Sequence, residues 1–349
     1  MFFYYDNFGN IYNNRYDALN SSEQCHLYWY DKELSKINWK IEPVESLTDL
    51  YKDRAQWIRD NYDYVIVAYS GGMDSTNVLE SFYYNNIHID EILTIGAFSQ
   101  SYAKDSDKNL CEDIYKNVIP TLNKLNLSKT KITIEDYTKS FNDIKKFNII
   151  QNHELDWYKN IGCFYSVHNF FWNNLQYRYN KNNTALVFGT ARPLISYDKI
   201  SNKTYTFFSD FNLVDYGNLP YEGNFQKVNF YTDLSCFKII LKQSHIILKF
   251  INECKKYEEN FSIFGIINDK GIVNDTIVRR LIYQLKNPLN YYSKKSKNNL
   301  ISIRDSYIFD KKNSDLYEIY NNGLLEFSNN FKYDIKNISP IRTKRYYLE

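Results

Sequence analysis

The sequence lacks the residue patterns that disulfide scaffolds, zinc sites and membrane spans require. Its five cysteines are scattered over 349 residues and form no CxxC pair or Cys/His cluster, which argues against a disulfide framework and structural zinc. No stretch approaches the roughly 20 apolar residues of a membrane span. The apolar run at the start, from Met1 to Tyr5, is too short for a signal peptide. We therefore expect a cytoplasmic protein, in the host cytoplasm if the chain is viral, with no membrane partner.

An excess of charge of either sign is also absent. Lys and Arg number 43 against 41 Asp and Glu, which gives a net charge of +2. This balance does not indicate nucleic-acid binding, although local basic patches leave it open. Glycine (11), proline (6) and methionine (2) are scarce beside 34 tyrosines, a bias typical of the AT-rich codons of a virus, phage or AT-rich bacterium. With 44% hydrophobic residues, the chain can bury a core.

The middle of the chain alternates between short apolar runs and helical patterns. Strands are predicted at residues 64–69, 91–98, 131–135 and 185–189, and helices at 75–86, 107–125 and 155–179. This order predicts an α/β fold in which a parallel sheet carries helices on both faces. Ligands of such sheets bind at the carboxyl ends of the strands, where the strand order reverses.

The flanks of this region have a different texture. Residues 1–61 form a polar, aromatic N-terminal extension with short strands and a helix over 46–61. After residue 192 we expect a mostly helical C-terminal region, for substrate binding or oligomerisation. It would hold a hairpin within 194–216 around Ser201-Asn202 and helices at 232–256 and 275–285. Residues from 286 onward give no assignment. The predicted domains are therefore 1–61, 62–192 and 193–349.

The segment that follows the first predicted strand carries the clearest chemical signal. Two adjacent glycines let the backbone turn sharply and present its N–H groups, and the helix that starts there adds its positive N-terminus. Two serine hydroxyls can donate to phosphate oxygens, while the aspartate suits a helix cap or a Mg²⁺ ligand. The spacing and lysine of a Walker A loop are missing. The residues are Ser70-Gly71-Gly72-Met73-Asp74-Ser75.

This segment resembles the PP-loop, SGGxDS, of the ATP pyrophosphatases, in the adenine nucleotide alpha-hydrolase-like superfamily. All motif positions match, with Met73 in the variable slot, and the preceding Ala68-Tyr69 is similar to the strand end of argininosuccinate synthases. The resemblance covers roughly residues 62–192. It implies a Rossmann-like fold and a site for ATP and Mg²⁺, with Asp74 as the metal ligand and as a catalytic residue.

The resemblance also implies a reaction class. Such enzymes adenylate a carbonyl or carboxylate oxygen and release pyrophosphate, and a nitrogen or sulfur nucleophile then displaces AMP. The loop holds the departing pyrophosphate electrostatically. Adenine would contact the end of the second strand, which by position falls on Gly96, Ala97 and Phe98.

Two further segments supply candidates for the site. Gly189 and Thr190 resemble the Gly-Thr turn beside the phosphates, and Arg192 would neutralise an α-phosphate or grip a carboxylate, unless it is a surface arginine on a turn. Lys242 belongs to a polar stripe that is either a solvated helix face or part of the active-site mouth. The stripe comprises Lys238, Lys242, His245 and Lys249.

The best-known subfamilies do not fit the sequence. Phe2 stands where glutamine-dependent asparagine synthetases have a catalytic cysteine, and the four-cysteine zinc site and paired CxxC motifs of other members are missing. We expect a ligase or an amide- or thio-transferase that acts on a small molecule or nucleobase. The alternative is a non-catalytic ATP- or AMP-binding protein that keeps the loop. Family members often form dimers or tetramers, which leaves a homo-oligomer open.

Overall fold

The computed structural model describes about three fifths of the chain. The described residues are 2–21, 24–96, 113–136, 179, 183–189, 192–198, 200–210, 225–256, 267, 272–283, 285, 286, 322, 325, 326, 328–330 and 341–349.

The largest described sheet has five strands, and every neighbouring pair in it is parallel. Its strands are short, and the three inner ones are rich in Val, Ile and Leu and buried at every residue except Tyr64, as expected for inner strands of a parallel sheet. The predicted α/β class with a parallel sheet is therefore confirmed, whereas helices on both faces of the sheet remain a prediction. In spatial order the strands are β10 (Phe225–Asn229), β7 (Thr184–Phe188), β4 (Tyr64–Ala68), β5 (Glu91–Gly96) and β6 (Lys131–Asp136).

The strand order reverses beside β4. From β4 the chain proceeds to β5 and β6 on one side, and it later returns to β7 and β10 on the other side. The carboxyl ends of β4 and β7 thus flank the switch point, where Rossmann-like sheets bind their ligands. The segments that leave these two ends are residues 69–72 and Gly189.

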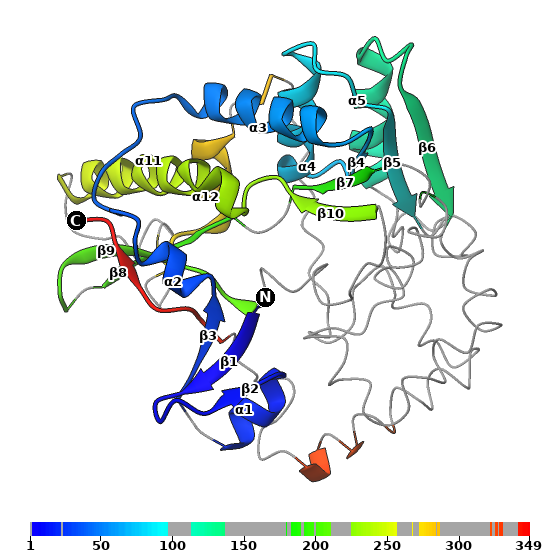
Figure 1. Ribbon diagram of the computed structural model, residues 1–349. Helices are drawn as coiled ribbons and strands as arrows, with labels where there is room; N and C mark the ends of the chain where they lie inside the picture. Colours follow the sequence, from blue (N-terminus) through cyan, green and yellow to red (C-terminus); the bar gives the residue numbers. More distant parts are fainter. Residues whose placement is uncertain are drawn as a thin grey trace.

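The described helices that pack on this sheet lie on the same side of it (Figure 1). α3 (Leu47–Asn61) begins at Ser46, whose side chain accepts from the Asp49 amide as an N-cap. α4 (Met73–Tyr83) follows the β4 turn, and Asn86, in the left-handed region at φ 56°, turns the chain after it. The π-helix η2 (Ile114–Val118) continues into α5 (Ile119–Lys124). The helix predicted over 155–179 lies outside the described residues except for Tyr179.

The described chain also forms two small antiparallel sheets. β1 (Phe2–Asp6) pairs with β2 (Ile11–Tyr12) and β3 (Cys25–Trp29), next to the short helices α1 (Arg15–Ser21) and α2 (Asp31–Leu34). β8 (Leu194–Asp198) and β9 (Lys203–Phe207) form the predicted hairpin, with Asn202 at φ 55° in its turn. β11 (Tyr346–Tyr347) adds the C-terminus to β9.

Two further helices complete the described fold. After the short η3 (Leu234–Cys236), α11 (Phe237–Lys256) runs beside α3, and α12 (Asp275–Ile282) packs against α11 (Figure 1). α11 contributes to both hydrophobic clusters of the molecule. Ile247 and Ile251 belong to the larger one around the parallel sheet, whereas Ile240 and Leu248 belong to the smaller one at the N- and C-terminal strands. Among the described residues, no helix is long and apolar enough to cross a membrane.

No pattern in the sequence indicated β10, the fifth strand of the parallel sheet. Its residues, Phe-Gln-Lys-Val-Asn, lack a β-branched run, and the strand forms because its backbone pairs with β7 in parallel register. The parallel sheet consequently is not contained in residues 62–192, because one of its strands lies beyond the expected boundary. Likewise α3, from the expected N-terminal extension, packs on α4.

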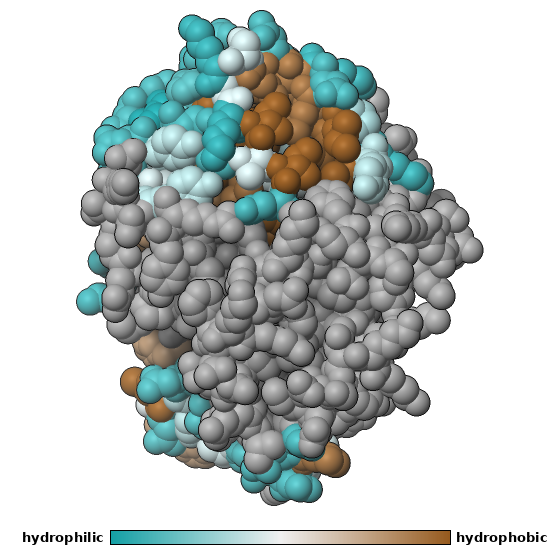
Figure 2. Space-filling model, turned by 90° about the vertical axis from the view of Figure 1, so that its right-hand side faces the viewer, coloured by the Kyte–Doolittle hydropathy of each residue, from teal (hydrophilic) through white to brown (hydrophobic). Residues whose placement is uncertain are grey.

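The opposite edge of the sheet carries exposed apolar side chains. Figure 2 shows hydrophobic residues gathered on the face that includes β6, bordered by hydrophilic ones. Ile132 and Ile134 of this edge strand are 45% and 42% exposed. The edge of the sheet at β6 is therefore an apolar surface of the described molecule. An edge strand of this kind can pair with another chain.

Candidate functional site

The turn after β4 is built around Gly71. Its φ of +76° lies in the left-handed region that favours glycine, and there is no room for a side chain. A Cβ atom would lie 2.8 Å from Val118 Cγ2 and 3.2 Å from the Asp113 carbonyl oxygen. The tight turn therefore depends on η2 as well as on the sequence of the loop.

Two serines close the loop on itself. Ser75 Oγ accepts from the Ser70 amide at 3.2 Å and lies 3.1 Å from Ser70 Oγ. It also donates to the Gly72 carbonyl at 3.2 Å. Gly72 itself is extended (φ −81°, ψ 164°), and no side chain caps the helix that it starts. α3 and α12, in contrast, have side-chain caps. The N-terminus of α4 thus keeps its positive partial charge at the strand end.

Gly189, which follows β7, touches the start of α4. A Cβ atom there would lie 2.7 Å from the Asp74 carbonyl oxygen and 3.0 Å from the Ser75 amide nitrogen. The two segments that flank the switch point are therefore in direct contact, and only glycine permits their approach. This packing brings two separately predicted parts of the site together.

The Asp74 side chain is held by two arginines and a tyrosine. Arg192 Nη1 donates to Oδ1 at 3.1 Å, and Tyr283 Oη donates to the same oxygen at 2.7 Å. Arg279 approaches with Nε and Nη2, each 3.0 Å from Oδ2. Such charge-assisted contacts from two guanidinium groups hold the carboxylate in one position.

A second carboxylate, Asp275, bridges the same two arginines. Its Oδ1 pairs with Arg192 Nη2 and its Oδ2 with Arg279 Nη1. The two aspartates and two arginines form a cluster without net charge, which we call the Asp–Arg cluster (Asp74, Arg192, Asp275 and Arg279). Asp275 is its outermost member, because its side chain is 50% exposed against 25% for Asp74 and 11% for Arg192.

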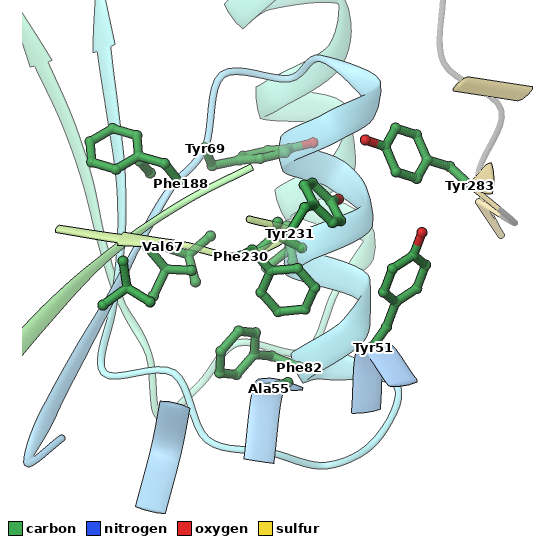
Figure 3. Close-up of a cluster of buried hydrophobic side chains, with 14 of the residues drawn as sticks. Tyr51, Ala55, Val67, Tyr69, Phe82, Phe188, Phe230, Tyr231 and Tyr283 are labelled. Carbon is green, nitrogen blue, oxygen red and sulfur yellow. The ribbon is translucent and has the colours of Figure 1, made fainter. Parts of the chain in front are cut away.

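Buried tyrosines support the cluster from within. Tyr231 donates to the Asp74 carbonyl at 2.9 Å and accepts from Asn77, and its ring lies 5.5 Å from that of Tyr283. Figure 3 shows Tyr51, Tyr231 and Tyr283 beside α4. Burial first, and then the charge of Asp74, raises the pKa of Tyr283 well above its ordinary value. Tyr283 is therefore a permanent hydrogen-bond donor to Asp74.

The surroundings of Asp74 do not fit the expected Mg²⁺ ion. Both of its carboxylate oxygens already accept hydrogen bonds from guanidinium groups, whose positive charge would repel a cation. A magnesium ion needs several oxygen ligands, and the second carboxylate of the cluster, Asp275, is paired with the same arginines. Among the described residues, no group of three or more His, Cys, Asp or Glu side chains could hold a metal ion. The role of Asp74 as a metal ligand is thus not supported.

The other predicted residues are distributed unevenly. Ala68 and Tyr69 are buried at the end of β4, where the Tyr69 carbonyl accepts from Thr94, and Gly96 ends β5 next to β6. Lys242 lies on α11, where it forms an ion pair with Glu42 at 2.8 Å and donates to the Pro43 carbonyl. Its positive charge is therefore neutralised on α11. Ala97, Phe98 and Thr190 lie outside the described residues.

Sequence reasoning missed three members of the site: Arg279, Asp275 and Tyr283. They lie on and just after α12, about 200 residues away from the loop in the sequence. The only sequence signal is the i, i+4 spacing of Asp275 and Arg279, which is a common ion pair on any helix. Their proximity to Asp74 could not be predicted from it.

Comparison of the chain with models of protein families, with curated proteins and with solved structures gave no match.

Proposed function

We propose that the chain is an ATP-using enzyme of the PP-loop type, which adenylates a carbonyl or carboxylate oxygen and releases pyrophosphate. A nitrogen or sulfur nucleophile of a small molecule or nucleobase then displaces AMP. The loop of residues 70–75 holds the pyrophosphate, and adenine lies toward the end of β5.

One observation carries this proposal: the complete SGGxDS motif stands at the carboxyl end of β4, at the switch point of a parallel sheet. A short motif can occur by chance in a sequence, but this position is where such sheets bind nucleotides. Gly71 in its left-handed conformation and the uncapped N-terminus of α4 give the loop the features of an anion site.

A second candidate is a nucleotide-binding protein without catalysis. It is favoured by the pairing of Asp74 with two arginines, which leaves this carboxylate no role as a metal ligand. Both candidates bind the nucleotide at the loop of residues 70–75, but only the first converts ATP to AMP and pyrophosphate.

Labelled ATP separates them. The full-length chain, incubated with ATP, Mg²⁺ and a panel of carboxylate and nucleobase acceptors plus ammonia or sulfide, should release AMP and pyrophosphate with at least one acceptor. Exchange of labelled pyrophosphate into ATP would report the adenylation step alone. Tight ATP binding without either reaction supports the second candidate. Release of ADP and phosphate overturns the pyrophosphatase proposal.

A variant with an unchanged fold provides the control for this assay. Gly72 has ordinary backbone angles, and a Cβ atom there would lie 3.4 Å from Ser70 Oγ, an ordinary contact. Gly72→Ala should therefore fold normally but place a methyl group where the backbone must approach a phosphate. We expect loss of ATP binding at wild-type thermal stability.

A further inference from the structure

Within the Asp–Arg cluster, Asp275 bridges the two arginines although both already pair with Asp74. Asp275 offers one carboxylate oxygen to each of two guanidinium groups, which come from different elements of the fold. Two oxygens of one phosphate group bind a pair of arginines in the same way. The Asp275 carboxylate thus occupies a position that suits two oxygens of a phosphate.

We propose that Arg192 and Arg279 form a phosphate clamp and that a phosphate or pyrophosphate group binds by displacing Asp275. The inference rests on the proposed function, in which the adjacent loop holds the pyrophosphate of ATP. In this proposal the two arginines neutralise the charge of the phosphate, a role that the resemblance assigns to a metal ion on Asp74.

The differences in exposure decide which carboxylate leaves. Asp275 is 50% exposed and binds each arginine through one oxygen, so water can replace these contacts at little cost. Asp74 is 25% exposed and additionally accepts from Tyr283, so it stays and fixes both guanidinium groups. Displacement of Asp275 therefore leaves both arginines positioned by Asp74.

The charges favour the exchange. With Asp275 in place the four side chains sum to zero, and without it two arginines and one aspartate leave a charge of +1. A phosphate group brings more negative charge than a carboxylate and additional acceptor oxygens. Arg192 keeps donor capacity, because its Nε is buried without a hydrogen-bond partner in the described part of the chain. The N-terminus of α4 lies one residue before Asp74 and adds positive potential.

The test measures binding of inorganic pyrophosphate to the full-length protein by calorimetry, in EDTA and again with Mg²⁺. Asp275→Asn removes the competing charge and keeps the side-chain shape. We expect it to bind pyrophosphate about tenfold more tightly than the wild type, the effect of one charge-assisted hydrogen bond. Arg279→Gln should weaken binding at least about tenfold, in the absence of metal as well.

Matched variants make the result specific. Arg280→Gln changes the exposed neighbouring arginine on the same helix, and Asp53→Asn removes an exposed negative charge on α3. Both should change the affinity less than about twofold. In Asp275→Asn combined with Arg279→Gln, the gain should vanish.

An unchanged or weaker affinity in Asp275→Asn overturns the clamp, and so does a gain that persists without Arg279. Misfolding cannot produce the expected gain. The two proposals also fail separately. Arg279-dependent pyrophosphate binding without AMP formation leaves the clamp intact, whereas AMP formation with unchanged pyrophosphate affinity in Arg279→Gln removes only the clamp.

Discussion

Gly71 and Gly72 are adjacent in the loop but meet different physical constraints. Gly71 combines a positive φ with close contacts to η2, so any side chain there strains the fold. Gly72 is extended and open, so the need for glycine there arises only from an approaching ligand. The same residue type is thus required for folding at one position and for binding at the next.

Alanine at each position should separate these constraints. Gly71→Ala is expected to lower the free energy of unfolding by about 2 kcal/mol or more, from the left-handed backbone and the overlap with Val118. Gly72→Ala should change it by less than about 0.5 kcal/mol. Urea denaturation measures both, and equal destabilisation would contradict the geometry of the turn.

A single residue, Lys227, makes the stability of the protein depend on pH. It lies on β10, and burial lowers its pKa from 10.5 to about 7. Between these values the unfolded chain binds more protons than the folded one, so stability rises with pH, by up to about 1.4 kcal/mol per pH unit. Below pH 7 the destabilisation is fully present.

Lys227→Met should remove this dependence. We expect the variant to be more stable than the wild type at pH 7, and the difference to shrink as the pH rises toward 10. The measurement is urea denaturation at several pH values, with Lys124→Met, an exposed position on α5, as the control. A difference that does not change with pH would show that Lys227 is not the titrating group.

At the scale of elements, α3 is fixed to the end of β10 by Arg54. This guanidinium group is buried and donates to the carbonyls of Asn229 and Phe230, 2.9 and 3.3 Å away, and to Ser235 Oγ. Because β10 has a weak strand sequence, these contacts help to hold the fifth strand in the sheet.

Arg54→Met should therefore destabilise the protein by about 3 kcal/mol, since two buried carbonyls lose charged donors. Lys52→Met, on the exposed side of α3, is the control and should change stability by less than about 0.5 kcal/mol. Chemical denaturation followed by circular dichroism compares the two. Similar stabilities would mean that β10 does not need Arg54.

The polar stripe of α11 is also an element-scale contact. Lys242 and Lys249 both pair with Glu42, at 2.8 and 2.7 Å, and His245 lies 3.0 Å from the Trp39 carbonyl. The stripe therefore faces the segment before α3. Helical periodicity identified this face, but could not identify what it contacts.

At the scale of the whole molecule, α11 joins two hydrophobic clusters. Its residues pack both against the parallel sheet and against the cluster of N- and C-terminal strands, which includes Tyr4, Leu27 and Leu348. A helix that is buried on two sides couples the unfolding of both clusters, because neither survives intact without it.

Substitutions in either cluster should therefore lower the midpoint of one common unfolding transition. Ile58→Ala in the larger cluster and Leu27→Ala in the smaller one each remove a fully buried side chain, at a cost of about 2 to 5 kcal/mol. Circular dichroism and tryptophan fluorescence should give coincident curves for both variants. A separate early transition in Leu27→Ala would show that the smaller cluster unfolds independently.

Local sequence patterns were enough to predict β4, β5, β6 and β7, the helix α3, the hairpin of β8 and β9, and the loop of residues 70–75. Each depends on neighbouring residues, through periodicity, capping or glycine geometry. Two features became evident only in the folded molecule: β10 joins the parallel sheet, and Asp275, Arg279 and Tyr283 lie around Asp74. Contacts between residues about 200 positions apart leave no local pattern, because their energy exists only after the chain has folded.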